Sequence, residues 1–318
     1  MFLLNVSLGS ISIPTRAIIN SIVGNEIKTS WEIILWNFRL PKALTAILVG
    51  MGLSISGLMM QTLFRNPLAG PYVLGLSSGS SLGVALVIMG SSLLPSFLIS
   101  SYGIVLASSI GSFLVLLAVL LVSQKLRDTM AILIVGLMFG SFTSAIVSVL
   151  SYFSTAQELQ KFMFWSMGSL SNLSWTAIGI LLVCVILGLM ISFFTIKPLD
   201  AMLLGENYAK SLGLNFNRTR FLIIFATSIL AGSITAFAGP IAFVGLAVPH
   251  LAKLLFQTSN HLILFWGTVL IGGILLLLCD SIAQLPGSDY TLPINAITSL
   301  VGAPVVIWLL VRKRKIMI

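Results

Sequence analysis

Nine long apolar stretches constrain the fold of this 318-residue chain more than any other feature of its sequence. A helix needs about 20 mostly apolar residues to cross the roughly 30 Å hydrocarbon core of a bilayer. Candidate spans of this kind cover residues 41–63, 68–93, 102–122, 129–153, 174–196, 219–237, 240–256, 262–285 and 292–311. The seventh is short, and we expect Pro249 to break it.

The composition agrees with a membrane protein. Hydrophobic residues make up 58% of the chain and charged residues only 8%, whereas a soluble domain carries about 25% charged residues. We therefore predict an all-α, polytopic helical protein in which residues 1–318 form a single transmembrane domain.

Basic residues between the spans are distributed unevenly, which predicts the orientation. If the spans alternate in direction, twelve basic residues fall on one side and five on the other. The richer side carries Arg65, Lys125, Arg127, Lys197, Lys210, Arg218, Arg220, Lys253, Arg312, Lys313, Arg314 and Lys315, and the poorer side Arg16, Lys28, Arg39, Lys42 and Lys161. Because cytoplasmic loops are enriched in Lys and Arg, we expect a cytoplasmic C-terminus and residues 1–38 outside. This bias explains the net charge of +9 without a nucleic-acid partner.

Two polar segments between spans have helical character. Residues 154–173, on the outer side, place apolar side chains on one face, so we predict a short helix at the outer rim. Residues 198–218, on the inner side, contain Glu206 four residues before Lys210, an order that supports a helix. Gly205 and Gly213 flank this pair and are expected to end short cytoplasmic helices.

Small residues recur at four-residue intervals in the span over 129–153, at Gly136, Gly140, Ser144 and Ser148. Such a stripe lets helices approach closely in lipid. It could equally line a translocation path, and the sequence alone leaves both interpretations open.

The P-loop motif of ATPases and the common metal-binding motifs are absent from the sequence. It contains no GxxxxGK[ST], HExxH or CxxC pattern, and we predict no catalytic residues, no metal site and no cofactor. Asp280 lies near the outer end of its span, where a structural role at the rim is favoured, and His250 is interpreted as a structural hydrogen-bonding residue. A membrane body without its own energy source suggests one subunit of a larger transport machine, although a stand-alone secondary transporter or channel remains an alternative.

Four stretches together resemble the FecCD-type permeases of bacterial ABC importers. They are RLPKALTAILVGMGLSISGLMMQTLFRNPLAGPYVLGLSSGSSLG, FWSMGSLSNLSW, GSITAFAGPIAFVGLAVPHLAK and LPINAITSLVGAPVVIWLL, in family order over about residues 39–311. The resemblance implies ten transmembrane helices per subunit and a homodimer in the cytoplasmic (inner) membrane. It also implies two ATP-binding cassette subunits below and an extracytoplasmic substrate-binding protein above. The substrate would be an iron–siderophore chelate, with cobalamin or haem as alternatives.

The resemblance also assigns roles to residues. Arg39 and Lys42 match the basic pair that meets the binding protein, and a further family arginine is replaced by Gln284. Gly205, Glu206, Ala209, Lys210 and Gly213 match the loop that contacts the ATPase. Gly136, Gly140 and Ser144 lie in the family's gate-lining helix and so become candidates for the translocation path.

The N-terminus departs from the family pattern. Only 13 residues precede Pro14, and as a helix they would reach about 20 Å, less than a full crossing. They match the outer end of the family's first helix, which is therefore apparently truncated. We expect a start codon further upstream, with a chain lacking that half-helix as the alternative.

Overall fold

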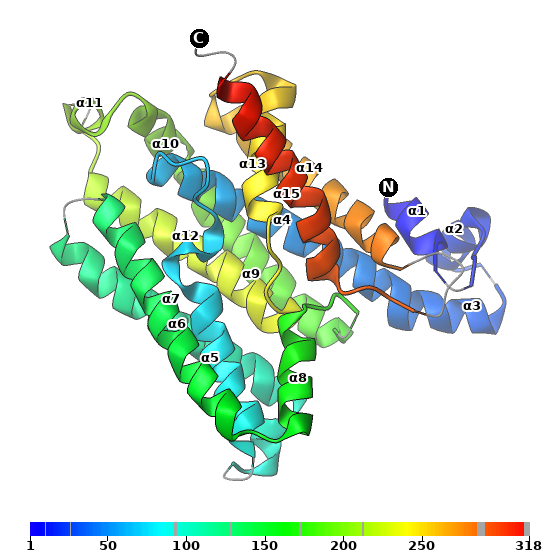
Figure 1. Cartoon of the computed structure of the whole chain (residues 1–318). Helices are drawn as coiled ribbons and strands as arrows, with labels where there is room; N and C mark the ends of the chain where they lie inside the picture. Colours follow the sequence, from blue (N-terminus) through cyan, green and yellow to red (C-terminus); the bar gives the residue numbers. More distant parts are fainter. Residues whose placement is uncertain are drawn as a thin grey trace.

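The computed structural model describes residues 1–9, 11–25, 27–91, 94–126, 129–171, 173–211, 213–284 and 290–314, and every regular element in these ranges is a helix. The helices are α1 Phe2–Ser7, α2 Thr15–Val23, α3 Thr29–Ile34, η1 Leu35–Arg39, α4 Leu40–Leu63, η2 Pro71–Leu74, α5 Leu76–Met89, η4 Ser96–Ile99, α6 Ser101–Lys125, α7 Thr129–Phe153, α8 Ala156–Ser166, α9 Trp175–Phe194, α10 Ile196–Leu203, α11 Glu206–Ser211, α12 Phe216–Ala238, α13 Val244–Phe256, α14 His261–Ala283 and α15 Ile294–Arg314. The long helices pack side by side in one bundle (Figure 1).

The predicted spans are present as helices. Six helical stretches are long and apolar enough to cross a membrane, namely 29–63, 102–122, 130–153, 175–194, 216–238 and 261–283. Three shorter apolar helices, at 76–89, 244–256 and 294–308, account for the remaining predictions. The all-helical, polytopic fold class is therefore confirmed.

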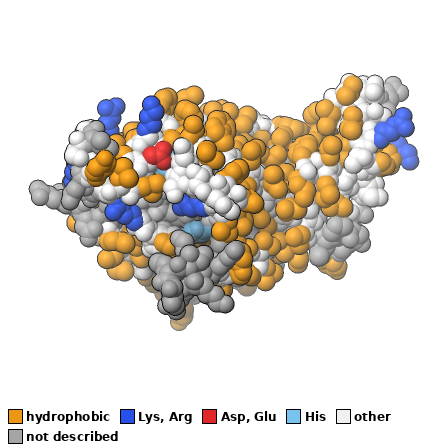
Figure 2. Space-filling model, turned by 90° about the horizontal axis from the view of Figure 1, so that it is seen from above, with side chains coloured by type: hydrophobic (Ala, Val, Ile, Leu, Met, Phe, Trp, Pro, Cys, Tyr) orange, Lys and Arg blue, Asp and Glu red, His pale blue; other side chains and the backbone are white. Residues whose placement is uncertain are grey.

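The bundle has two distinct ends. Helices α10 and α11 and the C-terminus lie at one end, and α8 and the N-terminal helices α1–α3 lie toward the other (Figure 1). Seen from above, basic side chains gather at opposite ends of the molecule, and hydrophobic side chains cover the band between them (Figure 2). An apolar band between two polar ends is the arrangement that a bilayer requires, since its core cannot solvate charge.

Helix α4 is the centre of the bundle. Twenty of its 24 residues are buried, and it packs against α9, α12, α13 and α14. Gly50 lies against the carbonyl of Gly272 on α14, and Gly57 lies against the carbonyl of Gly245 on α13. Glycine is needed at these positions because a side chain would overlap the neighbouring backbone.

Two boundaries differ from the sequence prediction. The span expected to begin at residue 68 starts as helix α5 only at Leu76, because Pro71 opens the separate short 3-10 helix η2 and Gly75 adopts a positive φ of 77°. The expected break at Pro249 is wrong, since α13 continues through it. Proline removes the donor that would bond the carbonyl four residues earlier, and that carbonyl, of Gly245, instead lies against Gly57 of α4.

Candidate functional site

The α10–α11 segment forms two short helices joined at a sharp corner. Gly205 separates them with a φ of 114°, and Gly213 ends the segment with a φ of 84°. Both angles lie in the left-handed region that glycine adopts without strain. Ala209 is fully buried, and α11 packs against α12 of the bundle. The prediction that Gly205 and Gly213 end short helices is therefore confirmed.

The outward side of this segment is apolar. Leu203, Leu204 and Tyr208 are each at least half exposed. They lie at a polar end of the molecule, where the lipid core is not expected to cover them. Lys210 lies with its Nζ 5.8 Å from the ring centroid of Phe216, a distance that allows a cation–π contact. The Glu206 side chain lies outside the described residues, so its predicted pairing with Lys210 stays a prediction.

Polar contacts fasten α10 to the ends of the membrane helices. Arg65, after α4, donates from Nη2 to the carbonyl of Met202 at 2.7 Å. Asp200 on α10 accepts from Nδ1 of His261 at 2.6 Å, and Nε2 of His261 lies 2.9 Å from the hydroxyl of Thr62 on α4. Sequence reasoning missed the cluster of Thr62, Asp200 and His261, because these residues are far apart in the chain and no spacing rule connects them.

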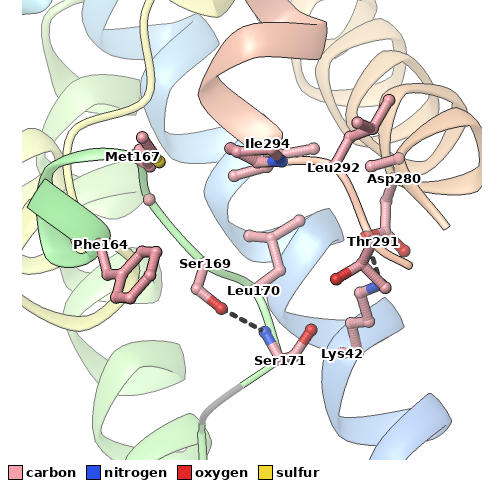
Figure 3. Close-up of a pocket in the computed structure, with 13 residues that line it drawn as sticks. Lys42, Phe164, Met167, Ser169, Leu170, Ser171, Asp280, Thr291, Leu292 and Ile294 are labelled. Atoms are coloured by element: carbon pink, nitrogen blue, oxygen red, sulfur yellow. Dashed lines mark hydrogen bonds and ion pairs between the residues drawn. The ribbon is translucent and has the colours of Figure 1, made fainter. Parts of the chain in front are cut away.

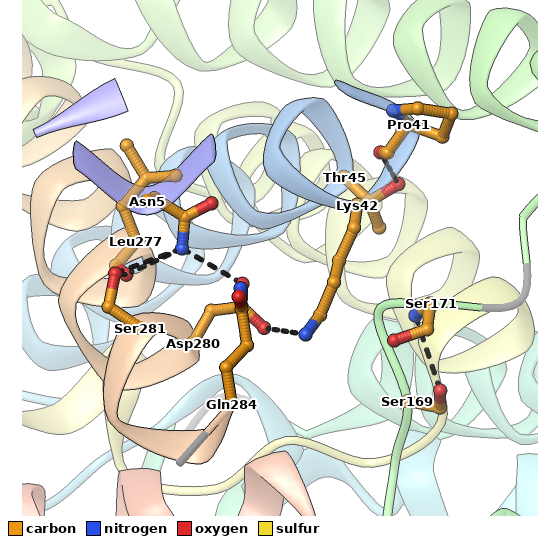
Figure 4. A network of polar contacts seen from close by, with 10 residues as sticks. All are labelled: Asn5, Pro41, Lys42, Thr45, Ser169, Ser171, Leu277, Asp280, Ser281 and Gln284. Carbon is orange, nitrogen blue, oxygen red and sulfur yellow. Dashed lines mark hydrogen bonds and ion pairs between the residues drawn. The ribbon is translucent and has the colours of Figure 1, made fainter. Parts of the chain in front are cut away.

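At the opposite end, Lys42 and Asp280 form an ion pair of 3.0 Å with side-chain exposures of 14% and 2% (Figure 4). The other carboxylate oxygen of Asp280 accepts from Asn5 at 2.9 Å and from Gln284 at 2.7 Å. Asn5 also donates to Ser281 on α14. Asp280 is thus tied to α4 and α1, which favours the predicted structural role, and Gln284 joins the same network.

Arg39 holds the N-terminal segment in place. Its guanidinium donates to the carbonyls of Val6 at 2.8 Å and Ser7 at 3.0 Å, and also to the carbonyl of Ile11. Both predicted docking cations, Arg39 and Lys42, are thus bound within the chain. Their role in docking stays a prediction. In that role, the two residues would have to meet the binding protein while keeping these internal contacts, or exchange them for new ones.

A pocket of about 220 Å³ opens beside the Lys42–Asp280 pair (Figure 3). Two irregular segments line it, 167–171 after α8 and 291–294 before α15. The amide of Asn295 donates to the carbonyl of Met167 at 3.3 Å, and the Asn295 side chain accepts from the amide of Ala242 at 3.0 Å. The pocket is therefore framed by loops that are tied to one another.

The small-residue stripe of α7 divides into two parts. Gly136 lies against the backbone of η2, where an added side-chain carbon would come within 2.7 Å of Leu74, and Gly140 faces Gly75 and Ser78. Ser144 is exposed, and its carbonyl accepts from the hydroxyl of Ser148. The two glycines therefore contribute to packing, while Ser144 belongs to a face of α7 that the chain itself leaves open.

His250 makes a hydrogen bond between two parts of the chain, as its interpretation as a structural residue requires. Nε2 of His250 lies 2.9 Å from the carbonyl of Pro67 and ties α13 to the irregular segment after α4. Within the described ranges, no group of three or more His, Cys, Asp or Glu residues is arranged to hold a metal ion.

Apolar helices packed around α4, with paired short helices at one end and a loop-framed pocket at the other, define a polytopic helical membrane protein. A model of the FecCD transport family matches residues 1–312. The chain belongs to this family, whose members are transport permeases and not enzymes, and it is a multi-pass membrane protein.

Individual relatives agree with this assignment. The vitamin B12 import system permease protein BtuC of Citrobacter koseri is 36% identical over 293 residues, covering 92% of this chain and 87% of that protein. The corresponding protein of Salmonella typhi is 35% identical, covering 92% and 88%.

Two solved structures share the fold. A metal-chelate type ABC transporter in an inward-facing conformation superposes with a TM-score of 0.86 at 32% identity, covering 98% of this chain and 95% of that one. PsaBC from Streptococcus pneumoniae, in complex with Fab, superposes with a TM-score of 0.58 at 16% identity, covering 92% and 95%. At that identity the second similarity concerns the fold alone.

Proposed function

We propose that this chain is the permease subunit of an inner-membrane ABC importer for a metal chelate. Two copies would form the path, two ATP-binding cassette subunits would bind at the α10–α11 end, and an extracytoplasmic binding protein would bind at the α8 end. This orientation places the C-terminus in the cytoplasm, as the distribution of basic residues predicts.

The observation that carries the proposal is the α10–α11 segment. Its side chains of Leu203, Leu204 and Tyr208 are exposed, although the segment is fixed to the bundle by Arg65 and Asp200. A short, rigid, apolar projection at a polar end suits insertion into a cleft of a soluble subunit, because apolar side chains supply the buried centre of an interface. Within this segment, Gly205, Glu206, Ala209, Lys210 and Gly213 are the proposed ATPase-coupling residues.

The proposed path lies along the open face of α7. Ser144 and its neighbours Ser141 and Ser148 are polar and exposed in the single chain, a placement that suits a lining between two copies. Gly136 and Gly140 would act beside the path by keeping α7 close to η2 and α5. Their proposed contribution to gating is thus the close fit of α7 to the short helix η2 and to α5.

Docking of the binding protein is proposed to use the positive charge at the α8 end. Arg39 and Lys42 are the candidates from the family pattern, and Arg16, Lys28 and Lys161 are exposed toward the same end. Opposite charges steer association and set its register more than they add affinity. Neutralising Arg39 and Lys42 should therefore slow association more at low salt than at high salt, whereas a loss that is the same at every salt concentration would reflect their disturbed internal contacts and contradict electrostatic docking.

The proposed substrate is an iron–siderophore chelate. Cobalamin is the second candidate, favoured by the relatives named as vitamin B12 permeases, and haem is a third. These substrates are bulky metal complexes, and the small and apolar residues of α7 do not discriminate among them.

Uptake of radiolabelled compounds identifies the substrate. Cells that lack their own chelate importers would receive this permease together with an ATP-binding cassette subunit and a substrate-binding protein of the same importer. ATP-dependent accumulation of iron supplied as a siderophore, and not of labelled cyanocobalamin or haem, is the expected result. Accumulation of cyanocobalamin alone would replace the iron proposal with the cobalamin one.

A further inference from the structure

We propose that Asp200, His261 and Thr62 form a clasp that makes the coupling helix α10 move together with α4 and α14. The inference rests on the proposed function, since it assumes that α10–α11 receives the movement of an ATPase subunit. It assigns His261 as a positioning residue that connects this segment to the centre of the bundle.

The clasp joins three elements at the start of α14. The carboxylate of Asp200 accepts from both Nδ1 of His261 at 2.6 Å and the backbone amide of His261 at 2.9 Å. The amides of a first helical turn have no partner within their own helix, and a carboxylate there is favoured by the helix dipole. Asp200 therefore caps α14 from a separate helix, so α10 cannot shift without disturbing this cap.

His261 extends the contact to α4. Its side chain is 2% exposed, and its Nε2 lies 2.9 Å from the Thr62 hydroxyl, which also lies 3.0 Å from the carbonyl of Leu58. Both ring nitrogens are therefore engaged, one on the coupling segment and one on α4. A buried imidazole with both nitrogens bonded has a fixed orientation, because an unpaired buried polar group would cost about 1–3 kcal/mol.

The two helices joined by the clasp are also locked together along their length. α4 and α14 approach through Gly50 and Gly272 near their middles, and Lys42 pairs with Asp280 close to their far ends. Contacts at both ends and the middle make α4–α14 a strut between the α10–α11 end and the pocket at the α8 end. Coupling between distant sites is carried by such packed and hydrogen-bonded connections.

The arrangement predicts that breaking the clasp leaves assembly with the ATPase intact but interrupts the coupling between the binding protein and the ATPase. The apolar contact surface at Leu203, Leu204 and Tyr208 would remain, so the ATPase would still bind and hydrolyse ATP at its basal rate. Binding of the partner protein at the α8 end would no longer be transmitted to the ATPase. This combination differs from a general loss of folding, which would reduce assembly and basal hydrolysis together.

The test measures phosphate release by the permease–ATPase complex in liposomes, with and without the ligand-free binding protein. Thr62→Val removes the hydroxyl at nearly constant volume and should lower the stimulation about fivefold, at the lower limit of typical coupling between sites. Thr62→Ser restores the hydroxyl and should retain the stimulation. Thr45→Val is the matched control, because the Thr45 hydroxyl is also buried in α4 and bonds a carbonyl four residues earlier.

Asp200→Asn and His261→Asn complete the experiment as a double-mutant cycle. If the residues act as one unit, the double variant loses no more stimulation than either single variant. Equal stimulation of Thr62→Val and the wild type would overturn the inference and leave the proposed function intact. A wild-type complex that fails to assemble, or that the binding protein does not stimulate, would overturn the proposed function and the inference with it.

Discussion

At the scale of single residues, polar side chains that are isolated in the sequence have bonding partners in the structure. The sequence placed Asp280 at a helix end, but its partner Lys42 lies on another helix and Asn5 on a third. Such contacts could not be predicted, because they depend on how α4 and α14 are rotated about their axes. The carboxylate is buried, so its charge has to be compensated within the chain.

Removing one partner of this pair should be costly. Lys42→Gln leaves the Asp280 carboxylate without its cation and should lower the free energy of unfolding by about 3–5 kcal/mol. The double variant Lys42→Gln/Asp280→Asn removes both charges and should recover a large part of that loss. Thermal unfolding in detergent measures both, and a double variant less stable than the single one would contradict the pairing.

At the scale of elements, close helix contacts decide where glycine is required. Small-residue spacing could be predicted from the sequence, but only the structure separates packing positions from open ones. Gly57 on α4 faces the backbone of Gly245, whereas Gly179 on α9 has open space where a side chain would project. The same reasoning explains α13, whose passage through Pro249 depends on a neighbour that sequence periodicity does not reveal.

Alanine at these two glycines should have opposite effects. Gly57→Ala inserts a methyl group against backbone and should destabilise the fold by about 1–3 kcal/mol. Gly179→Ala should be neutral or stabilise α9 by up to about 1 kcal/mol, since alanine is the better helix former. Comparison of their melting temperatures is the measurement, and equal shifts would contradict the packing around α4.

The rim helix α8 should depend on pH through its first turn. The hydroxyl of Thr155 and the side chain of Glu158 form a capping box, and Glu158 also accepts from Ser91 at 3.0 Å. The backbone amide of Thr155, followed by the hydroxyls of Thr155 and Ser91, lowers the pKa of Glu158 below its ordinary value. A lowered pKa means that this contribution is complete at neutral pH and is lost as the pH falls through the lowered pKa.

Hydrogen exchange at residues 155–160, corrected for its intrinsic pH dependence, should therefore lose protection in acid. Glu158→Gln removes the titrating group and should abolish this loss. An unchanged acid response in the variant would show that another group controls the helix.

At the scale of the whole molecule, the apolar spans and the two polar segments were sufficient to predict the class of fold. Helices at 154–173 and 198–218 are present, and they lie at different ends of the bundle (Figure 1). The connection between those ends could not be predicted, because the Thr62–His261 and Lys42–Asp280 contacts arise from long-range packing. Helix formation can be predicted from local sequence. Which helices move together depends on contacts between distant residues and cannot be predicted in this way.

We propose that this chain transports a chelate only as part of an ATP-driven complex. The most direct measurement is uptake of the labelled chelate into liposomes that contain the chain alone or the complete complex with ATPase and binding protein. We predict uptake only by the complete complex, and only with ATP. Uptake by the chain alone, or by the complete complex without ATP, would contradict the claim and favour a stand-alone transporter or channel.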